Sequence, residues 1–368
     1  MKGKMNIHKL TASIAAVLLS ASLFSCSSDD FFGKPESEST NGISFGVSTE
    51  NSAATRANKT DDGLTVARYT LRSDNSADTL CVRAVVTDGI GNNANKPATR
   101  AAMQTSTYND FKVVAAVKEN GNVGSQYYMN DVATKTGTNW VPSKVYYWPG
   151  SNRQLRFLAW APTDAVFQSV PNSPNTTTLQ YTTPAEAKNQ RDLVAAATDF
   201  IDSPANNGTC TPVSLNFKHL CTAVIIKTGE TMTAGTIKSV SLKGVKNSGT
   251  YDMVNSAWTL TDSKADFTIS PNQATTSTTP NGTDLNAGES TFMLLPQTLG
   301  ADSKLEVEFH DNISGKDRIL TASLNGAEWP MGKTVTYRLS ITPEYELNIE
   351  NTSEMLDAHY IVEPIKVK

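Results

Sequence analysis

The chain has 368 residues, of which 39% are hydrophobic and only 18% charged, and its formal net charge is −4 at pH 7. That length suffices for two ordinary domains, and a surface so poor in charge must consist largely of Ser, Thr, Asn and Gly, which favours strands and turns over solvated helices. A net acidic chain without basic runs is unsuited to nucleic acid, because phosphate contacts need clustered Lys and Arg.

The first 25 residues have the pattern of an export signal. Lys2, Lys4 and Lys9 precede an uncharged, mostly apolar stretch over residues 10–24. Because about 20 apolar residues are needed to span a bilayer, this stretch is too short for a membrane helix and predicts a cleaved secretory signal. Removal of the three lysines leaves 29 basic residues against 36 acidic ones, a net charge of −7.

A lone cysteine follows the apolar stretch. Residues 23–25 before Cys26 resemble a lipobox, the recognition sequence of bacterial lipoprotein signal peptidase. Cleavage there would leave Cys26 as the first residue, and more than one acyl chain on it would give stable anchoring in the outer membrane. Residues 28–30, Ser-Asp-Asp, resemble a short acidic signal for export to the outer face of that membrane. A plain secreted protein that is cut nearby is the alternative.

Three further cysteines are present: Cys81, Cys210 and Cys221. An odd number cannot form a complete disulfide framework once Cys26 is lipidated. Cys221 opens an apolar run and is expected to be a small buried side chain. A bridge between Cys210 and Cys221 stays open as an alternative.

The N-terminal third contains two predicted strands between polar segments. Residues 27–40 are polar and charged and indicate a flexible tether. Residues 43–49 form the first strand pattern and residues 79–90 the second. In the first strand three apolar side chains alternate with polar ones: Ile43, Phe45 and Val47. The polar linker after each strand ends in the same tetrapeptide, ATRA, at residues 54–57 and 98–101.

From Tyr108 the chain becomes a series of short strand patterns separated by turn residues, which is typical of a β-sandwich. Only residues 184–198 have a helical pattern. The expected strands cover residues 111–117, 126–134, 144–149, 155–162, 212–228, 237–245, 249–254, 257–261, 290–297, 304–310, 318–324 and 333–342.

Several of these segments together resemble the fimbrillin family of type V pili, over residues 40–343. The segments that carry the resemblance are ISFGVSTENSAATRA, VYYWPGSNRQLRFLAWAP, VSLNFKHLCTAVIIKT, FMLLPQTL and WPMGKTVTYRLSI, in that order. The resemblance implies an all-β fold with two transthyretin-like β-sandwich domains in tandem, in a surface lipoprotein of Bacteroidales-type bacteria that serves as a pilus subunit. It implies no catalysis.

The predicted division of the chain follows from these patterns and the resemblance. It comprises a lipoprotein signal peptide (1–25), a lipidated tether and pro-segment with a displaceable strand (26–100), an N-terminal sandwich (101–209), a C-terminal sandwich (210–344) and a C-terminal extension (345–368).

Candidate chemical motifs are few. Residues 42–46 fit G-x-S-x-G, but Ser44 lies in a strand pattern with no helix after it, whereas a nucleophile elbow needs a strand, a sharp turn and a helix. His219 is expected to be a packed, hydrogen-bonded core residue. Asp357 and His359 lack a third metal ligand nearby. We therefore expect no enzyme activity, no metal and no cofactor; a surface glycan hydrolase is the enzyme-class alternative.

An aromatic cluster has two interpretations. Its members are Trp140, Tyr146, Tyr147, Trp148, Phe157 and Trp160. Because successive side chains of a strand point to opposite faces, most of the cluster is expected in the core of the first sandwich. A sugar-stacking platform is the alternative, with Tyr147 as the outward-facing candidate.

The two ATRA linkers are candidate protease sites. An arginine between small residues in a flexible linker suits a trypsin-like protease. In the fimbrillin family such cleavage releases the first strand, here Ile43, Phe45 and Val47, and the resulting groove is filled by a strand from another subunit, which is β-augmentation. Arg56 and Arg100 both fit, and Arg100 is slightly favoured because it immediately precedes the strands of the folded body.

The C-terminal extension offers two candidate donor strands. Tyr345, Leu347 and Ile349 alternate with polar residues. The second candidate contains four apolar residues around Pro364, which confines it to an edge or a bulge: Tyr360, Val362, Ile365 and Val367. Both strands could instead complete the protein's own second sandwich or begin a further module.

These patterns predict a lipoprotein subunit of a cell-surface fimbria. Its expected partners are other pilus subunits, the outer membrane through the lipid, and an arginine-specific protease. The alternative is a non-polymerising surface lipoprotein that binds a glycan or a host protein through its loops.

Overall fold

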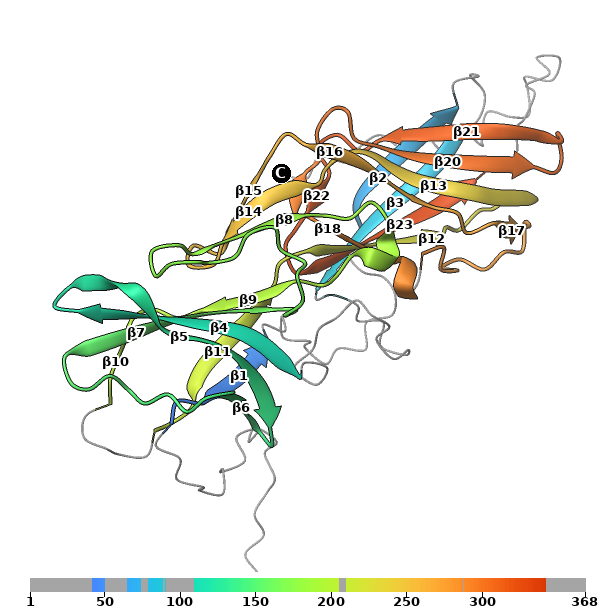
Figure 1. Ribbon diagram of the computed structural model, residues 1–368. Coiled ribbons are helices and arrows are strands. Elements are labelled where there is room, and N and C mark those ends of the chain that lie inside the picture. The colour runs from blue at the N-terminus through green and yellow to red at the C-terminus, as the bar shows by residue number, and fades with distance from the viewer. Residues whose placement is uncertain are drawn as a thin grey trace, which may run out of the picture. The chain divides into compact units, whose positions relative to one another are not determined.

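Strands dominate the part of the chain that the structure, a computed structural model, describes (Figure 1). The described residues are 42–49, 65–73, 79–88, 90, 109–204, 210–286 and 288–341, all within the compact unit Ser39–Lys368. Their only helical turns are two one-turn 3₁₀ helices, η1 (Ala187–Asn189) and η2 (Gly288–Ser290). The predicted all-β fold class is confirmed. No helix among these residues is long and apolar enough to cross a membrane.

The first sheet closes on itself. Its strands are β1 (Phe45–Thr49), β4 (Asp110–Glu119), β5 (Asn122–Thr136), β6 (Asn139–Pro142), β7 (Arg153–Ala161), β9 (Val194–Ala197), β10 (Ile201–Asp202) and β11 (Val213–His219). Their order is β10-β7-β4-β5-β6-β1-β11-β9, and β9 also pairs with β7, so seven strands form a ring. Inside it lies an aromatic core that includes Phe45, Phe111, Phe157 and Phe217.

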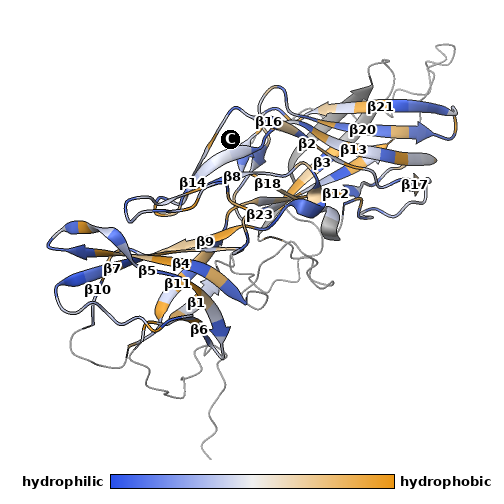
Figure 2. Cartoon of the chain, viewed as in Figure 1, coloured by the Kyte–Doolittle hydropathy of each residue, from blue (hydrophilic) through white to orange (hydrophobic). Residues whose placement is uncertain are grey.

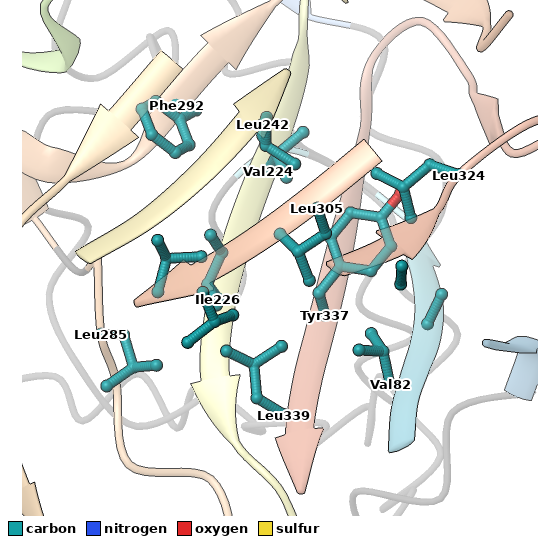
Figure 3. Close-up of a cluster of buried hydrophobic side chains, with 14 of the residues drawn as sticks. Val82, Val224, Ile226, Leu242, Leu285, Phe292, Leu305, Leu324, Tyr337 and Leu339 are labelled. Carbon is teal, nitrogen blue, oxygen red and sulfur yellow. The ribbon is translucent and has the colours of Figure 1, made fainter. Parts of the chain in front are cut away.

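The second sheet includes a hairpin from the N-terminal part of the chain, whose strands β2 (Thr65–Ser73) and β3 (Thr79–Asp88) pair with each other. Its strands are β2 (Thr65–Ser73), β3 (Thr79–Asp88), β12 (Thr222–Thr228), β13 (Gly235–Lys246), β16 (Lys264–Ile269), β17 (Gln273–Thr275), β18 (Phe292–Leu294), β20 (Lys304–Asp311), β21 (Lys316–Ser323) and β23 (Lys333–Ile341). The order is β16-β13-β20-β21-β2-β3-β23-β12-β18, with β17 paired to β13. Val82, Ile226 and Leu339 point into its core (Figure 3). Along these strands hydrophobic and polar residues alternate (Figure 2).

Two small sheets complete the fold. β8 (Thr178–Thr182), β14 (Ser248–Asp252) and β15 (Ala257–Leu260) form one, in the order β15-β14-β8, and β19 (Gln297–Thr298) pairs with β22 (Glu328–Trp329) in the other. The three-stranded sheet packs Leu179, Tyr181 and Tyr251 into a third hydrophobic cluster. Sheet membership crosses the predicted domain boundaries, since β8 pairs with β14 and β11 belongs to the first sheet. The division into domains stays a prediction.

Two expected elements are wrong. Residues 184–198 form no α-helix: they hold η1 and then β9, whose small side chains lie buried between β7 and β11. Helix propensity is a weak prior that tertiary pairing overrides. Residues 144–149 form no strand. They keep the predicted alternation, because Tyr146 and Trp148 pack on the first core while Tyr147 is exposed.

Candidate functional site

β1 closes the first sheet although it is only five residues long. It pairs in parallel with β11 from Phe45↔Val213 to Thr49↔Phe217, and with β6 only at Phe45↔Trp140. The amide of Val213 donates to the Ser44 carbonyl at 2.8 Å. The strand is therefore held mainly along one edge, by a neighbour far away in the sequence.

The side chains of β1 and of the residues before it fill the first core. Phe45 is fully buried, and its ring meets those of Phe111 and Phe157 edge to face, at centroid distances of 5.8 and 5.4 Å. Ile43 is also buried, and Val47 packs partly against the same core. Fully burying one such side chain is worth about 1.5–3 kcal/mol. Removal of β1 would consequently leave an apolar groove beside an unpaired edge of β11.

Ile43 also fixes the aromatic loop that precedes β7. Its amide donates to the carbonyl of Tyr146 at 2.7 Å, and the hydroxyl of Tyr128 donates to the carbonyl of Tyr147. The core assignment of the aromatic cluster is confirmed for Trp140 and Phe157, which are buried in the first core, whereas Trp160 is buried in the third hydrophobic cluster. Tyr147 is 58% exposed.

The segment between the two ATRA tetrapeptides is part of the second sheet. β3 pairs with β23 along nine residue pairs, from Leu80↔Ile341 to Asp88↔Lys333, and β2 reaches β21 at Arg72↔Thr321 and Ser73↔Leu320. Val82 and Ala84 are buried in the second core. The sequence analysis missed β2, although the alternation of Ala67, Tyr69 and Leu71 with polar residues is a signal that could have found it.

The other predicted site residues lie outside the described residues. They are the lipidation candidate Cys26, the protease sites Arg56 and Arg100, and the donor-strand residues Tyr345, Leu347, Ile349, Ile365 and Val367. The pair Asp357 and His359 also lies there. Their roles stay predictions.

A buried ion pair lies at the end of β11, beside the start of β9. His219, the last residue of β11, places Nδ1 2.7 Å from Oδ2 of Asp192, and both side chains are buried. Burial lowers the pKa of His219, but the charge of Asp192 and its hydrogen bond outweigh burial and hold that pKa above its ordinary value. The expectation of a packed, hydrogen-bonded core histidine is confirmed.

The neighbouring thiol is unsuited to nucleophilic chemistry. Burial, together with the charge of Asp192, raises the pKa of the Cys221 thiol far above its ordinary value, and only the thiolate is a nucleophile. The alternative of a bridge is wrong, because Cys221 and Cys210 are not joined by a disulfide. Ser44 immediately precedes β1, so a strand and not a helix directly follows it. Across the described residues, no group of three His, Cys, Asp or Glu side chains could hold a metal ion.

Residues 99–356 match the family model described as fimbrillin-like. No curated protein matches the chain. Among solved structures it is similar to a fimbrial protein from Bacteroides vulgatus ATCC 8482, at 17% identity over 65% of this chain and 95% of that one, with a TM-score of 0.46. It is also similar to the fimbrial anchor protein Mfa2 from Porphyromonas gingivalis, at 13% identity over 64% and 79%, with a TM-score of 0.30. This chain belongs to the fimbrillin-like family.

Proposed function

We propose that the chain is a structural subunit of a cell-surface fimbria and that it assembles by exchange of its first strand. The observation that carries the proposal is the position of β1. This short strand completes the ring of the first sheet and contributes Phe45 to its core, yet it pairs with β6 at one residue only. Arg56 follows its last residue, Thr49, in a polar linker.

Loss of β1 would create an acceptor for another strand. The backbone of β11 from Val213 to Phe217 and the carbonyl of Tyr146 would lose their partners. An unpaired edge beside an apolar groove is a template for strand addition, in which main-chain hydrogen bonds supply affinity and alternate side chains supply specificity. The alternating residues Tyr345, Leu347 and Ile349 of another subunit are one candidate occupant, and Ile365 with Val367 is the other.

The topology distinguishes the two candidate arginines. Cleavage at Arg56 would separate β1 alone, whereas cleavage at Arg100 would separate β1, β2 and β3 from the body. The second event would strip β23 of its partner along nine residue pairs and remove Val82 and Ala84 from the second core. We therefore propose Arg56 as the productive site, in place of the slight preference for Arg100 that the sequence suggested.

Export and anchoring form the remainder of the proposal. The signal and the lipobox-like residues before Cys26 would send the chain to the outer membrane with acyl chains on that cysteine. The lipid would hold the precursor at the surface. Because Cys26 lies on the N-terminal side of both arginines, cleavage at Arg56 would separate the subunit from its anchor as well as from β1.

The test combines N-terminal sequencing of the protein from cells with fibre isolation by shearing. We expect a mature chain that begins at Ala57, fibres in the Arg100→Ala strain and none in the Arg56→Ala strain. Arg100→Ala is the matched control, because it makes the same substitution in the second copy of the ATRA tetrapeptide. Fibres of normal abundance from Arg56→Ala cells, with residues 43–49 retained, would contradict strand release at this site.

An exposed aromatic residue favours a second candidate function, the binding of a glycan or a host protein. Tyr147 is 58% exposed and Val145 is 68% exposed on the loop before β7. Aromatic rings present an apolar face with a polar tip, which suits stacking on sugars. Loss of binding to a glycan array in Tyr147→Ala, with fibre formation unchanged, would support this role.

A further inference from the structure

One indole N–H in the first core has no hydrogen-bond partner. Trp140 is only 3% exposed, and its buried Nε1 makes no hydrogen bond with the described residues. Two other tryptophans satisfy the same group. Nε1 of Trp258 donates to the Leu220 carbonyl at 2.8 Å. Nε1 of Trp329 donates to the Tyr337 hydroxyl at 2.9 Å. Because a buried tryptophan N–H usually finds an acceptor, the exception at Trp140 needs an explanation.

Trp140 lies directly beside β1. β6, β1 and β11 are neighbours in the first sheet (Figure 1). In the register of the sheet Lys135 is opposite Trp140, and Trp140 is opposite Phe45. Side chains directly opposite each other on neighbouring strands lie next to each other on one face. Lys135 covers the indole from the β5 side, with Nζ 5.1 Å from the ring centroid. The side chain at position 45 is therefore the neighbour that faces the indole from β1.

β1 offers Trp140 no acceptor side chain. The side chains that β1 and the residues before it place against the core are all hydrocarbon: Ile43, Phe45 and Val47. An indole N–H can only donate, so an apolar neighbour leaves it unsatisfied, and an unsatisfied buried donor is destabilising. A strand with a tyrosine in place of Phe45 would supply the missing acceptor, as Tyr337 does for Trp329.

The segment after β23 contains such a tyrosine. When Tyr345 is aligned with Phe45, Leu347 takes the next core-facing position. The polar residues Glu346 and Asn348 then take the outward positions. The segment thus repeats the alternation of β1 in the same chain direction, which the parallel pairing of β1 with β11 requires.

The second tyrosine of the tail fits the groove less well. When Tyr360 is aligned with Phe45, the apolar Ile361 takes an outward position and Pro364 takes the place of Thr49. The backbone at Thr49 is paired with β11, and proline has no N–H for such a ladder. We therefore favour Tyr345.

The alignment of Tyr345 exchanges one hydrogen bond for another. Pro343 takes the place of Ile43, whose amide donates to the Tyr146 carbonyl at 2.7 Å, and proline lacks that N–H. This carbonyl lies in a loop with exposed residues, so water can replace the lost donor. Nε1 of Trp140 is buried, so an acceptor from the incoming strand satisfies a group that β1 leaves unpaired.

We propose that Tyr345 of another subunit takes the place of Phe45 and that its hydroxyl accepts a hydrogen bond from Nε1 of Trp140. This inference rests on the proposed exchange of β1, and it identifies the residue by which the groove recognises its donor strand. A site built to bond a hydroxyl discriminates against the analogue that lacks it. Trp140 thus distinguishes the donor from β1 itself.

Phe45→Tyr tests the acceptor position within one full-length chain bearing Cys26→Ser. The substitution brings a hydroxyl to the position assigned to Tyr345 and needs no second subunit. Hydrogen exchange in β11 measures how tightly β1 is held, because the two strands are paired. We expect exchange to slow by at least about threefold, the effect of one added hydrogen bond. The same substitution in a Trp140→Phe chain should accelerate exchange, because the buried hydroxyl then has no partner.

Phe157→Tyr is the matched control. Phe157 is buried in the same core, with its ring centroid 5.4 Å from that of Phe45. A hydroxyl there should accelerate exchange in β11 equally with and without Trp140. If Phe45→Tyr likewise accelerates exchange to the same extent in both backgrounds, the hydrogen bond is overturned, whether or not strands are exchanged.

A second arm identifies the occupant of the groove. Fluorescent peptides of residues 342–350, with Tyr345 or with Tyr345→Phe, are titrated against the full-length Cys26→Ser chain that also carries Phe45→Ala, and anisotropy is read. We expect the tyrosine peptide to bind at least about threefold more tightly. The difference should vanish when the chain also carries Trp140→Phe. A peptide of residues 357–365, which contains Tyr360, is titrated in parallel.

The outcomes separate this inference from strand exchange itself. Equal binding of the tyrosine and phenylalanine peptides would overturn the hydrogen bond and leave strand exchange supported. Tighter binding of the second peptide that depends on Tyr360 would overturn Tyr345 as the occupant. Binding of neither peptide would count against strand exchange with this tail, and it would overturn Tyr345 as the occupant even if Phe45→Tyr slowed exchange in β11.

Discussion

Phe45 is the residue of β1 whose loss should weaken the strand most. Its side chain is fully buried between the rings of Phe111 and Phe157. Replacement of a buried phenylalanine by alanine costs about 3–5 kcal/mol, because transfer free energy is lost and a cavity is left. We expect Phe45→Ala to weaken the docking of β1 by about 3 kcal/mol, which raises the population of molecules with β1 undocked by about 100-fold.

Hydrogen exchange read by mass spectrometry on the peptide that covers β11 measures this opening. β11 is paired with β1 from Val213 to Phe217, so the amides that face β1 exchange when it leaves. If β1 opens as a local unit, exchange in β11 accelerates in Phe45→Ala while exchange in β20 and β21 stays unchanged.

Phe267→Ala is the matched control for this experiment. Phe267 is equally buried, but it belongs to the core of the second sheet, where its ring meets that of Phe292. Its replacement should accelerate exchange in that sheet and leave β11 unaffected. Uniform acceleration of both sheets by Phe45→Ala would mean that β1 leaves only when the whole protein unfolds, and it would refute the idea of a displaceable strand.

Four other changes test separate parts of the argument. The pKa of His219 in the folded state lies above its ordinary value of 6.5. Its pairing with Asp192 therefore adds stability that is complete below pH 6.5 and is lost as the pH rises through the folded-state pKa. In His219→Gln this pH dependence of the free energy of unfolding should disappear. Asn286→Ala should lower the free energy of unfolding, measured by urea denaturation, by about 2–4 kcal/mol. The buried Asn286 amide accepts a hydrogen bond from the Ile226 amide at 2.6 Å and donates one to the Val224 carbonyl at 2.9 Å. Cys26→Ala should abolish incorporation of labelled palmitate. Deletion of 345–368 should leave the melting temperature near that of the intact chain and prevent fibres if the segment is a donor, whereas a marked drop in melting temperature would place it in the protein's own core.

The alternation of side chains predicted the existence of most strands but not their sheets. Residues 212–228 are predicted as one long strand, yet the chain leaves the first sheet at His219 and enters the second at Thr222. In β11 one face is buried and the other is not. In β12 both faces are buried, because Ala223 packs in the third hydrophobic cluster and Val224 packs in the core of the second sheet. Periodicity records how many faces are buried, not which neighbour buries them.

The sequence likewise predicted only part of the candidate site. Ile43, Phe45 and Val47 could be selected from the sequence, because three alternating apolar residues need a buried face. Their pairing partner could not be, since β11 lies 168 residues away at the Ser48–Asn216 contact. Local patterns carry no information about contacts of this range, which depend on the closure of the whole sheet.

The two ATRA tetrapeptides show why position in the fold decides what a motif does. As sequence they are identical, so a protease that reads only neighbouring residues should treat Arg56 and Arg100 alike. The topology makes them different, because the hairpin of β2 and β3 separates them and pairs with β21 and β23. A cut before the hairpin removes one short strand from one sheet. A cut after it also divides the second sheet between β21 and β23. If both sites are cut in cells, the order matters: early cleavage at Arg100 should yield a body with two incomplete sheets, and early cleavage at Arg56 should yield one with a single open groove.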